Sequence, residues 1–414
     1  MFLKLKKREI SAFFKSHLFI SICGSIIGVL STAIFFILIS KNLEQIFLAK
    51  FSLSILFFFS VLKISLMGLD QNIIAHSKSL NAKKIIFDQK IKLLFIPIGV
   101  SISIYYILYV LRDIFIVDFF VSDFLILNLS VILGLLCRTL QSYLQASSKL
   151  LENAKANLCR YLSYLLFIII WIFNNDLNIM FYFFVGEILT ITFLMFSILL
   201  NIGFKYSHKI KNYNIKYLYL GISEFSYEGL FKLDLLTIAI FGNQKLLVTY
   251  AILSNVIEGI INFLSIAHPM INNFMNRFKY DQVLKKELVL MKYMNIFSIL
   301  ILLMIFPAYF IFNYFVFMKF PQYELIIIAI LFSSLLILFR KVFLFFFYFS
   351  INNAPQKQLK FSLLMFLGNF IFNIVLFNYI GLFGIVISTL VVYFLSTIYI
   401  SAFLKIYKKV LNFV

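Results

Sequence analysis

The sequence predicts an all-α polytopic membrane protein with about 12 transmembrane helices. Apolar residues make up 63% of the 414 residues and charged residues only 13%, whereas a soluble domain is roughly half apolar and a quarter charged. The apolar residues also form continuous runs of about 20, the length that an α-helix needs to cross ~30 Å of hydrocarbon. Strands of a membrane barrel would instead alternate in polarity over about ten residues.

Twelve apolar runs mark the predicted helices, and they fall into two sets of six. The fifth run is short as bounded and can be extended to Leu158. The first set is His17–Ser40, Leu53–Leu69, Leu93–Leu111, Phe124–Leu144, Tyr161–Phe173 and Ile179–Phe204. The second set is Tyr217–Phe241, Val248–Ile271, Tyr293–Phe315, Leu325–Phe349, Phe361–Tyr379 and Gly381–Phe403.

The positive charge of the chain lies on one side of the predicted helices. The formal net charge is +20. Seven segments on the side of the N-terminus contain 27 Lys and Arg residues and 6 acids, while the five inter-helix segments on the other side contain 5 bases and 6 acids. Because Lys and Arg accumulate in cytoplasmic loops, both termini are predicted to be cytoplasmic. This distribution accounts for the charge without a nucleic-acid partner.

The two sets of six helices share features that predict a parallel internal repeat. Pro97 in the third run corresponds to Pro307 in the ninth, and Arg138 in the fourth corresponds to Arg340 in the tenth. Transporters built from such repeats bind their substrates between the halves. A chance alignment of Phe- and Ile-rich helices is the alternative explanation. The predicted units are an N-terminal bundle over 1–204, a cytoplasmic linker over 205–216 and a C-terminal bundle over 217–414.

Ionisable residues inside the predicted helices mark the candidate site. Each costs at least ~2.5–3.5 kcal/mol at the bilayer centre, so it is expected to face a wet cavity or to pair with another charge. Both interpretations stay open for the bases. Three of these residues, in the seventh helix, follow an i, i+4, i+8 spacing and share one helix face. The candidate bases are Lys63, Arg138, Lys232 and Arg340, and the candidate acids are Glu187, Glu224, Glu228, Asp234 and Glu258.

Sequence motifs for catalysis or metal binding are missing. The three scattered cysteines form neither a disulfide framework nor a zinc spacing, and the four histidines lie at membrane edges or in loops. There is no P-loop and no nucleophile-elbow motif. We therefore expect a protein that is not an enzyme and that has no catalytic residue, cofactor or metal ligand.

Four stretches carry a family resemblance. They are the end of the fourth run with its loop (CRTLQSYLQASSKLLENAKANL), a stretch from the seventh and eighth runs (KLDLLTIAIFGNQKLLVTYAILSNVIE), the sequence HPMINNF, and GLFGIVIST at the start of the last run. Together with span count and orientation, they resemble the O-antigen and polysaccharide flippases of the Wzx type, in the multidrug/oligosaccharidyl-lipid/polysaccharide exporter superfamily. The chain departs from that pattern after Gln145 and Ala146, where Ser147 and Ser148 replace the usual glycine.

The resemblance implies two six-helix bundles arranged as a MATE-like V around a central cavity, in a bacterial inner membrane. It implies a polyprenyl-pyrophosphate-linked oligosaccharide, such as an O-antigen repeat unit, as cargo, with membrane lipids and the polysaccharide polymerase or chain-length machinery as partners. We expect the four bases to bind pyrophosphate, since Arg can clamp phosphate oxygens. We expect the acids to bind a coupling H⁺ or Na⁺, with Asp234, Glu187 and Glu258 as the leading candidates.

Two other functions fit parts of the sequence. A multidrug antiporter of the same superfamily would export organic cations, but four cavity bases would repel such a cargo. A membrane-embedded polysaccharide polymerase or glycosyltransferase usually mounts its catalytic residues on a sizeable loop. The exterior loops here are about 12 residues at most, which disfavours an enzyme.

Overall fold

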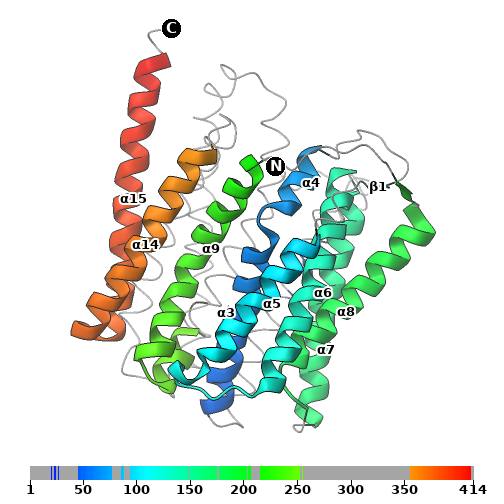
Figure 1. Cartoon of the computed structure of the whole chain (residues 1–414), viewed down its shortest axis with the longest axis horizontal. Coiled ribbons are helices and arrows are strands. Elements are labelled where there is room, and N and C mark those ends of the chain that lie inside the picture. The colour runs from blue at the N-terminus through cyan, green and yellow to red at the C-terminus, as the bar shows by residue number, and fades with distance from the viewer. Residues whose placement is uncertain are drawn as a thin grey trace, which may run out of the picture. The chain divides into compact units, whose positions relative to one another are not determined.

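The structure is a computed structural model in which several segments of the chain are described. These segments comprise residues 20, 23, 24, 27, 45–76, 85–87, 94–147, 149–174, 177–202, 204–206, 215–251, 254 and 355–411. Within them the protein is almost entirely helical (Figure 1). Most of the runs predicted at 17–40 and 248–271, and all of the runs at 293–315 and 325–349, lie outside the described residues.

Long apolar helices dominate the described segments, and five of them are long and apolar enough to cross a membrane. They confirm the predicted all-α, multi-pass membrane class, whereas the cytoplasmic location of the termini stays a prediction. The helices are α3 (Gln45–Leu66), α4 (Leu69–His76), α5 (Phe95–Val110), α6 (Val121–Ala146), α7 (Leu150–Phe173), α8 (Phe181–Phe196), α9 (Ile215–Phe241), α14 (Pro355–Ile380) and α15 (Leu382–Leu411), with a 3₁₀ turn at Arg112–Ile114 and a π-helical turn at Ser197–Ile202.

Two three-residue strands accompany the helices. Strand β1 (Ile85–Phe87) pairs in parallel with β2 (Phe204–Tyr206), and Ile85 lies opposite Phe204. The strands lie in or at the edge of two segments that the charge distribution places on one side of the membrane. Their pairing agrees with that placement, because hydrogen-bonded strands lie about 5 Å apart.

Helix α3 begins at Gln45, eight residues before the predicted start at Leu53. The sequence boundary stopped short of Lys50, a charge that is unfavourable inside a membrane helix. In the structure the Lys50 Nζ lies 2.6 Å from Oδ2 of Asp123 in α6 and 4.7 Å from the centroid of the Phe120 ring. These partners offset the burial of the ammonium group.

Helix α7 also begins earlier than predicted, at Leu150 instead of Tyr161. Its first three turns contain polar residues that the sequence analysis assigned to a cytoplasmic loop. Their side chains find partners in the helical bundle: Lys155 pairs with Glu152 at 2.9 Å, and Gln141 Nε2 donates to Asn157 Oδ1 at 2.8 Å. With this extension the helix reaches 24 residues, enough to cross the membrane.

The described residues cluster into two compact units. The first contains α3 to α8 and both ends of α9. Its helices α3 and α6 run in parallel, because Lys50 meets Asp123 at one end while Leu62 lies beside Gly134 further along. Its core is aromatic, and the Phe58 and Phe183 rings stack with centroids 4.6 Å apart.

The second unit contains residues 226–238 of α9 together with α14 and α15. Helices α14 and α15 pack as a hairpin. Gly381 makes the turn between them with a φ of +60°, a backbone conformation that residues other than glycine rarely adopt. The predicted division of the chain at 205–216 stays a prediction, since much of the second half lies outside the described residues.

Candidate functional site

A buried polar cluster lies in the second unit around Asp234 of α9, which is fully buried. Its Oδ1 accepts hydrogen bonds from Nδ2 of Asn369 at 2.9 Å and Nδ2 of Asn373 at 2.7 Å. Its Oδ2 accepts a hydrogen bond from the Thr389 hydroxyl at 2.8 Å. Ser388 completes what we call the Asp234 cluster, since its hydroxyl donates toward Asn369 Oδ1 at 3.2 Å and also contacts Asn373 Oδ1.

Local sequence explains how three helices supply these groups. Asn369 and Asn373 are one turn apart on α14, so both face the same neighbour. The Gly381 turn brings α15 back along α14. Gly384 allows the two helices to meet closely, because a Cβ at this position would overlap the Leu376 carbonyl. Ser388 and Thr389 then follow two turns into α15, opposite the asparagines.

The cluster combines one carboxylate with neutral hydrogen-bonding groups. Hydrogen bonds to the charged form stabilise a buried carboxylate. The same five side chains also carry two amide oxygens and two hydroxyl oxygens next to the carboxylate. Oxygen donors of this kind are the ligands of hard cations. The arrangement is therefore able to hold a proton or a small monovalent cation after modest rotation of the amides.

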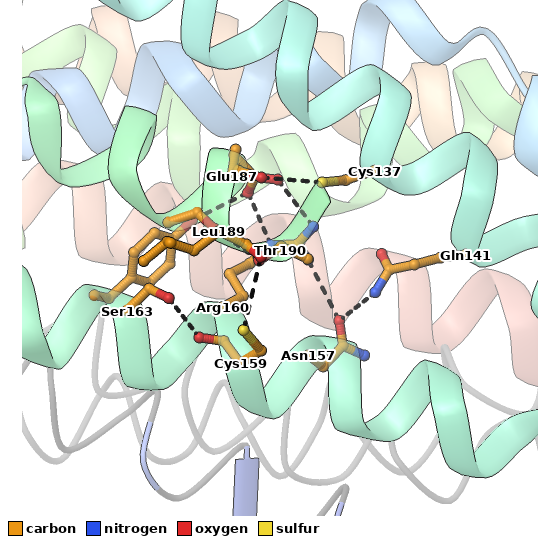
Figure 2. A network of polar contacts seen from close by, with 11 residues as sticks. Cys137, Gln141, Asn157, Cys159, Arg160, Ser163, Glu187, Leu189 and Thr190 are labelled. Atoms are coloured by element: carbon orange, nitrogen blue, oxygen red, sulfur yellow. Dashed lines mark hydrogen bonds and ion pairs between the residues drawn. The ribbon is translucent and has the colours of Figure 1, made fainter. Parts of the chain in front are cut away.

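A second polar network, in the first unit, joins α6, α7 and α8 around Arg160 and Glu187 (Figure 2). Both residues are almost fully buried. Arg160 Nη2 donates to Glu187 Oε2 at 2.9 Å, and Nε lies 2.8 Å from Oε1 without pointing at it. The Tyr164 hydroxyl donates to Oε1 at 3.2 Å. On the other side of the guanidinium, Nη1 donates to Asn157 Oδ1 at 3.3 Å.

The Arg160–Glu187 pair changes the interpretation of two residues. Arg160 was counted as a loop base from the sequence, and the structure corrects this by placing it inside α7. Its charge is tolerated because the carboxylate of α8 neutralises it in place. Glu187, an expected coupling acid, uses both of its carboxylate oxygens for this pair, and its proposed role in coupling stays a prediction.

The predicted cargo-binding bases occupy different helices. Lys63 on α3, Arg138 on α6 and Lys232 on α9 are all half-buried. The Arg138 guanidinium makes no hydrogen bond or ion pair with any residue in the described part of the chain. Arg340 lies outside the described residues. Convergence of the four bases on one cavity therefore stays a prediction.

Of the three remaining predicted acids, the structure describes only the backbone of two. Glu224 and Glu228 lie on α9, but their side chains fall outside the description, and Glu258 is not described at all. Among the described residues no group of three or more His, Cys, Asp and Glu side chains could hold a metal ion.

The neutral members of the Asp234 cluster and the base Arg160 are not among the site residues predicted from the sequence. One available signal was the pair of asparagines at i and i+4 in the otherwise apolar stretch NFIFN of α14. Another was the length of the fifth run, since 13 residues are too few to cross the membrane and an extension toward the N-terminus brings Arg160 into the helix.

Comparison with solved structures shows which fold these helices form. No family model matches the sequence, and no curated protein matches it. The chain is similar in structure to MATE in complex with MaD5, with a TM-score of 0.61, 9% identity and 96% of each chain covered. It is also similar to an outward-facing multidrug resistance MATE family transporter of the MOP superfamily, with a TM-score of 0.56, 10% identity and 96% of each chain covered.

A third similar structure is a MOP superfamily transporter from Pyrococcus furiosus, for which the reverse polarity of the binding pocket suggests a different function. The TM-score is 0.55, the identity is 10%, and 93% of each chain is covered. At these identities the likeness establishes the fold, which is that of MATE and MOP superfamily transporters, and the chain is a multi-pass membrane protein.

Proposed function

We propose that the protein is a flippase that carries a polyprenyl-pyrophosphate-linked oligosaccharide across the bacterial inner membrane by alternating access. Cation binding at the Asp234 cluster drives the return of the empty carrier. The observation that carries the proposal is the Asp234 cluster itself, a buried carboxylate surrounded by oxygen-bearing side chains inside a transporter fold.

The need for a polar path follows from the chemistry of the cargo. Each sugar hydroxyl that loses its water without compensation costs about 4–8 kcal/mol by alkane transfer, so an oligosaccharide does not cross hydrocarbon unaided. A transporter with a wet cavity removes that cost while the polyprenyl tail stays in the lipid. The multi-pass fold provides the helices that such a cavity requires.

The pyrophosphate group needs positive charge along this path. Arg138 is suited to this role because it is half-buried in a predicted membrane helix, and its guanidinium makes no hydrogen bond or ion pair with any of the described residues. A guanidinium can hold two phosphate oxygens at once. Lys63, Lys232 and Arg340 would add charge from both predicted halves of the chain.

Membrane potential and a coupling ion would act together. An inside-negative membrane potential favours the outward movement of an anion by about 2.3 kcal/mol per charge for every 100 mV. The empty carrier must then return, and we propose that Na⁺ or H⁺ at Asp234 favours that step. If the flipping rate in vesicles with a clamped potential did not depend on either the Na⁺ or the H⁺ gradient, Asp234 would have no role in ion coupling.

The test of the cargo is a flipping assay in proteoliposomes that contain a short polyprenyl-pyrophosphate-linked oligosaccharide. We expect Arg138→Ala to reduce the initial rate at least about tenfold, as loss of one charge-assisted phosphate contact would. Arg112→Ala is the matched control, because Arg112 lies outside the predicted spans and is 37% exposed. Equal rates for the Arg138 variant and the wild-type protein would contradict the proposed role.

A multidrug or cation antiporter is the second candidate. It is favoured by the structural likeness to a multidrug resistance MATE family transporter. The same proteoliposomes distinguish the two functions when they are loaded with ethidium in place of the lipid-linked sugar. Ion-driven ethidium efflux without oligosaccharide flipping would establish the antiporter and exclude the flippase.

A further inference from the structure

We propose that the backbone contact between Gly68 and Gly221 closes the transport path on the predicted cytoplasmic side and opens once in every cycle. This inference rests on the proposed transport function but concerns a contact that cargo identity does not determine. Both glycines lie in the first compact unit, at the break between α3 and α4 and in the second turn of α9.

The two backbones touch without side chains between them. A Cβ on Gly68 would overlap the carbonyl of Tyr217, and it would lie 3.3 Å from the Gly221 nitrogen. A Cβ on Gly221 would in turn overlap the Gly68 nitrogen. Any larger residue at either position would therefore hold α9 away from the α3–α4 break. Contacts of this type let helices approach closely in membranes.

The α3–α4 break is also strained. Met67 has a φ of +46° and Gly68 a φ of +75°, so two successive residues adopt left-handed conformations. Glycine tolerates this conformation, but a methionine does so only at a cost in free energy. Strained residues of this kind persist where the surrounding structure holds them, and switch regions are one such place.

A buried amide beside the break opposes closure. Asn72 lies one turn into α4, and its backbone N–H donates to the Gly68 carbonyl at 3.0 Å. The Asn72 side chain is fully buried, yet neither its Oδ1 nor its Nδ2 has a hydrogen-bond partner in the described part of the protein. An unsatisfied buried amide is unfavourable, and water would satisfy it if the contact opened.

The place of the contact in the chain gives it a role in transport. Gly68 ends the second predicted span and Gly221 lies near the start of the seventh, so one belongs to each predicted half and both lie at predicted cytoplasmic ends. Alternating access requires the halves to separate at one end of the path and then to close again. Close backbone contact favours closure, while the strain and the buried amide favour opening, so the contact contains contributions to both arrangements.

The experiment uses Ser65→Cys as a reporter, because Ser65 is fully buried one turn before Gly68. It is introduced into the full-length chain with the three native cysteines replaced by alanine, and inside-out membrane vesicles are treated with a membrane-impermeant maleimide. We expect slow labelling in this parent and a rate about tenfold higher with Gly68→Ala, which blocks closure. Asn72→Leu should lower the rate by a similar factor, because it removes the unsatisfied amide.

Gly99→Ala is the matched control, since a Cβ at Gly99 meets no atom within 4 Å, and it should leave the labelling rate unchanged. A parent that is never labelled, or equal labelling in the parent and both test variants, would overturn the proposal. If the Gly68 variant does not accumulate, the Asn72 variant decides alone, because an unchanged rate contradicts a closure that opens. Labelling as expected without oligosaccharide flipping would instead remove the proposed cargo and leave the closure standing.

Discussion

Arg160 on α7 and Glu187 on α8 form a charge pair inside the first unit, with Nη2 and Oε2 2.9 Å apart. Both side chains are at most 5% exposed, so neither charge has water to stabilise it. The Tyr164 hydroxyl and Asn157 amide take up further hydrogen-bonding capacity of the pair. The pair therefore fixes the mutual position of α7 and α8, and loss of either side chain would leave the other as an unpaired buried charge.

Removal of Arg160 should strongly destabilise the protein. Breaking a buried pair leaves an uncompensated charge and typically costs about 3–5 kcal/mol. We expect Arg160→Met to lower the thermal unfolding midpoint of the detergent-solubilised protein, measured by light scattering or tryptophan fluorescence. The double variant Arg160→Met with Glu187→Leu should recover most of that loss, because both charges are then gone.

Lys155→Ala is the control for this measurement. Its pair with Glu152 lies in the same helix at 2.9 Å, but the lysine is 41% exposed. Exposed pairs contribute only about 0–1 kcal/mol, so the midpoint should hardly move. A similar loss in the Lys155 and Arg160 variants would show that burial does not determine the contribution of these pairs.

Ion binding at the Asp234 cluster should be visible as ligand-dependent stability. A cation that binds only the folded protein raises its stability by about 2.7 kcal/mol at a concentration 100 times its dissociation constant. We expect Na⁺, against an equal concentration of choline, to raise the unfolding midpoint of the wild-type protein. Asp234→Asn and Asn373→Ala should abolish that increase.

Ser362→Ala provides the matched control in the same unit. Ser362 is buried on α14, and within the described part of the chain it donates only to the Leu359 carbonyl of its own helix, 3.1 Å away. Its loss should leave the response to Na⁺ intact. A Na⁺ response that persists in Asp234→Asn would place the cation elsewhere, and a response to pH alone would identify H⁺ as the ion.

The helices were predictable because membrane insertion imposes a length and a composition that are visible locally in the sequence. Helices α5, α6 and α9 begin and end within a few residues of the predicted runs. The short fifth run indicated an extension of α7 toward the N-terminus, but the start at Leu150 was not visible, because the polar residues of that segment are compatible with a membrane helix only through partners such as Glu187, which is 27 residues from Arg160. The pairing of β1 with β2 likewise joins segments far apart in the chain.

The candidate site was predictable only as far as its charge. Asp234 stood out because an acid in an apolar run is costly. Its partners Asn369 and Thr389 did not, since neutral polar residues occur in many membrane helices and their importance depends on which carboxylate they reach. Those contacts span 135 and 155 residues, so they are set by the packing of α9, α14 and α15 rather than by any local pattern.

Asp123 should stabilise the start of α6 through several contacts at once. Its Oδ2 accepts the backbone N–H of Phe120 at 2.8 Å and lies 2.6 Å from Lys50 Nζ, while Asn178 Nδ2 donates to Oδ1 at 2.8 Å. Loss of a helix cap alone costs about 0.5–2 kcal/mol, and the unpaired lysine adds to this. We expect Asp123→Ala to lower the unfolding midpoint clearly, whereas Asp118→Ala, at an exposed position, should not change it.

Gly186 and Gly368 should respond in opposite directions to the same substitution. A Cβ on Gly186 would overlap the ring of Tyr164, which stacks on Tyr182 at a centroid distance of 4.4 Å and donates to Glu187. Overpacking of this kind costs about 1–3 kcal/mol, so Gly186→Ala should lower the unfolding midpoint.

At Gly368, in the middle of α14, the nearest atom to an added Cβ is a Val392 methyl carbon at 3.9 Å, an ordinary contact distance. Replacing a helical glycine by alanine at such a position gains about 0.5–1 kcal/mol from the lower backbone entropy of the unfolded chain. Gly368→Ala should therefore raise the midpoint measured under the same conditions. If both variants shifted the midpoint in the same direction, the contact of Gly186 with Tyr164 would not be what makes a side chain at that position unfavourable.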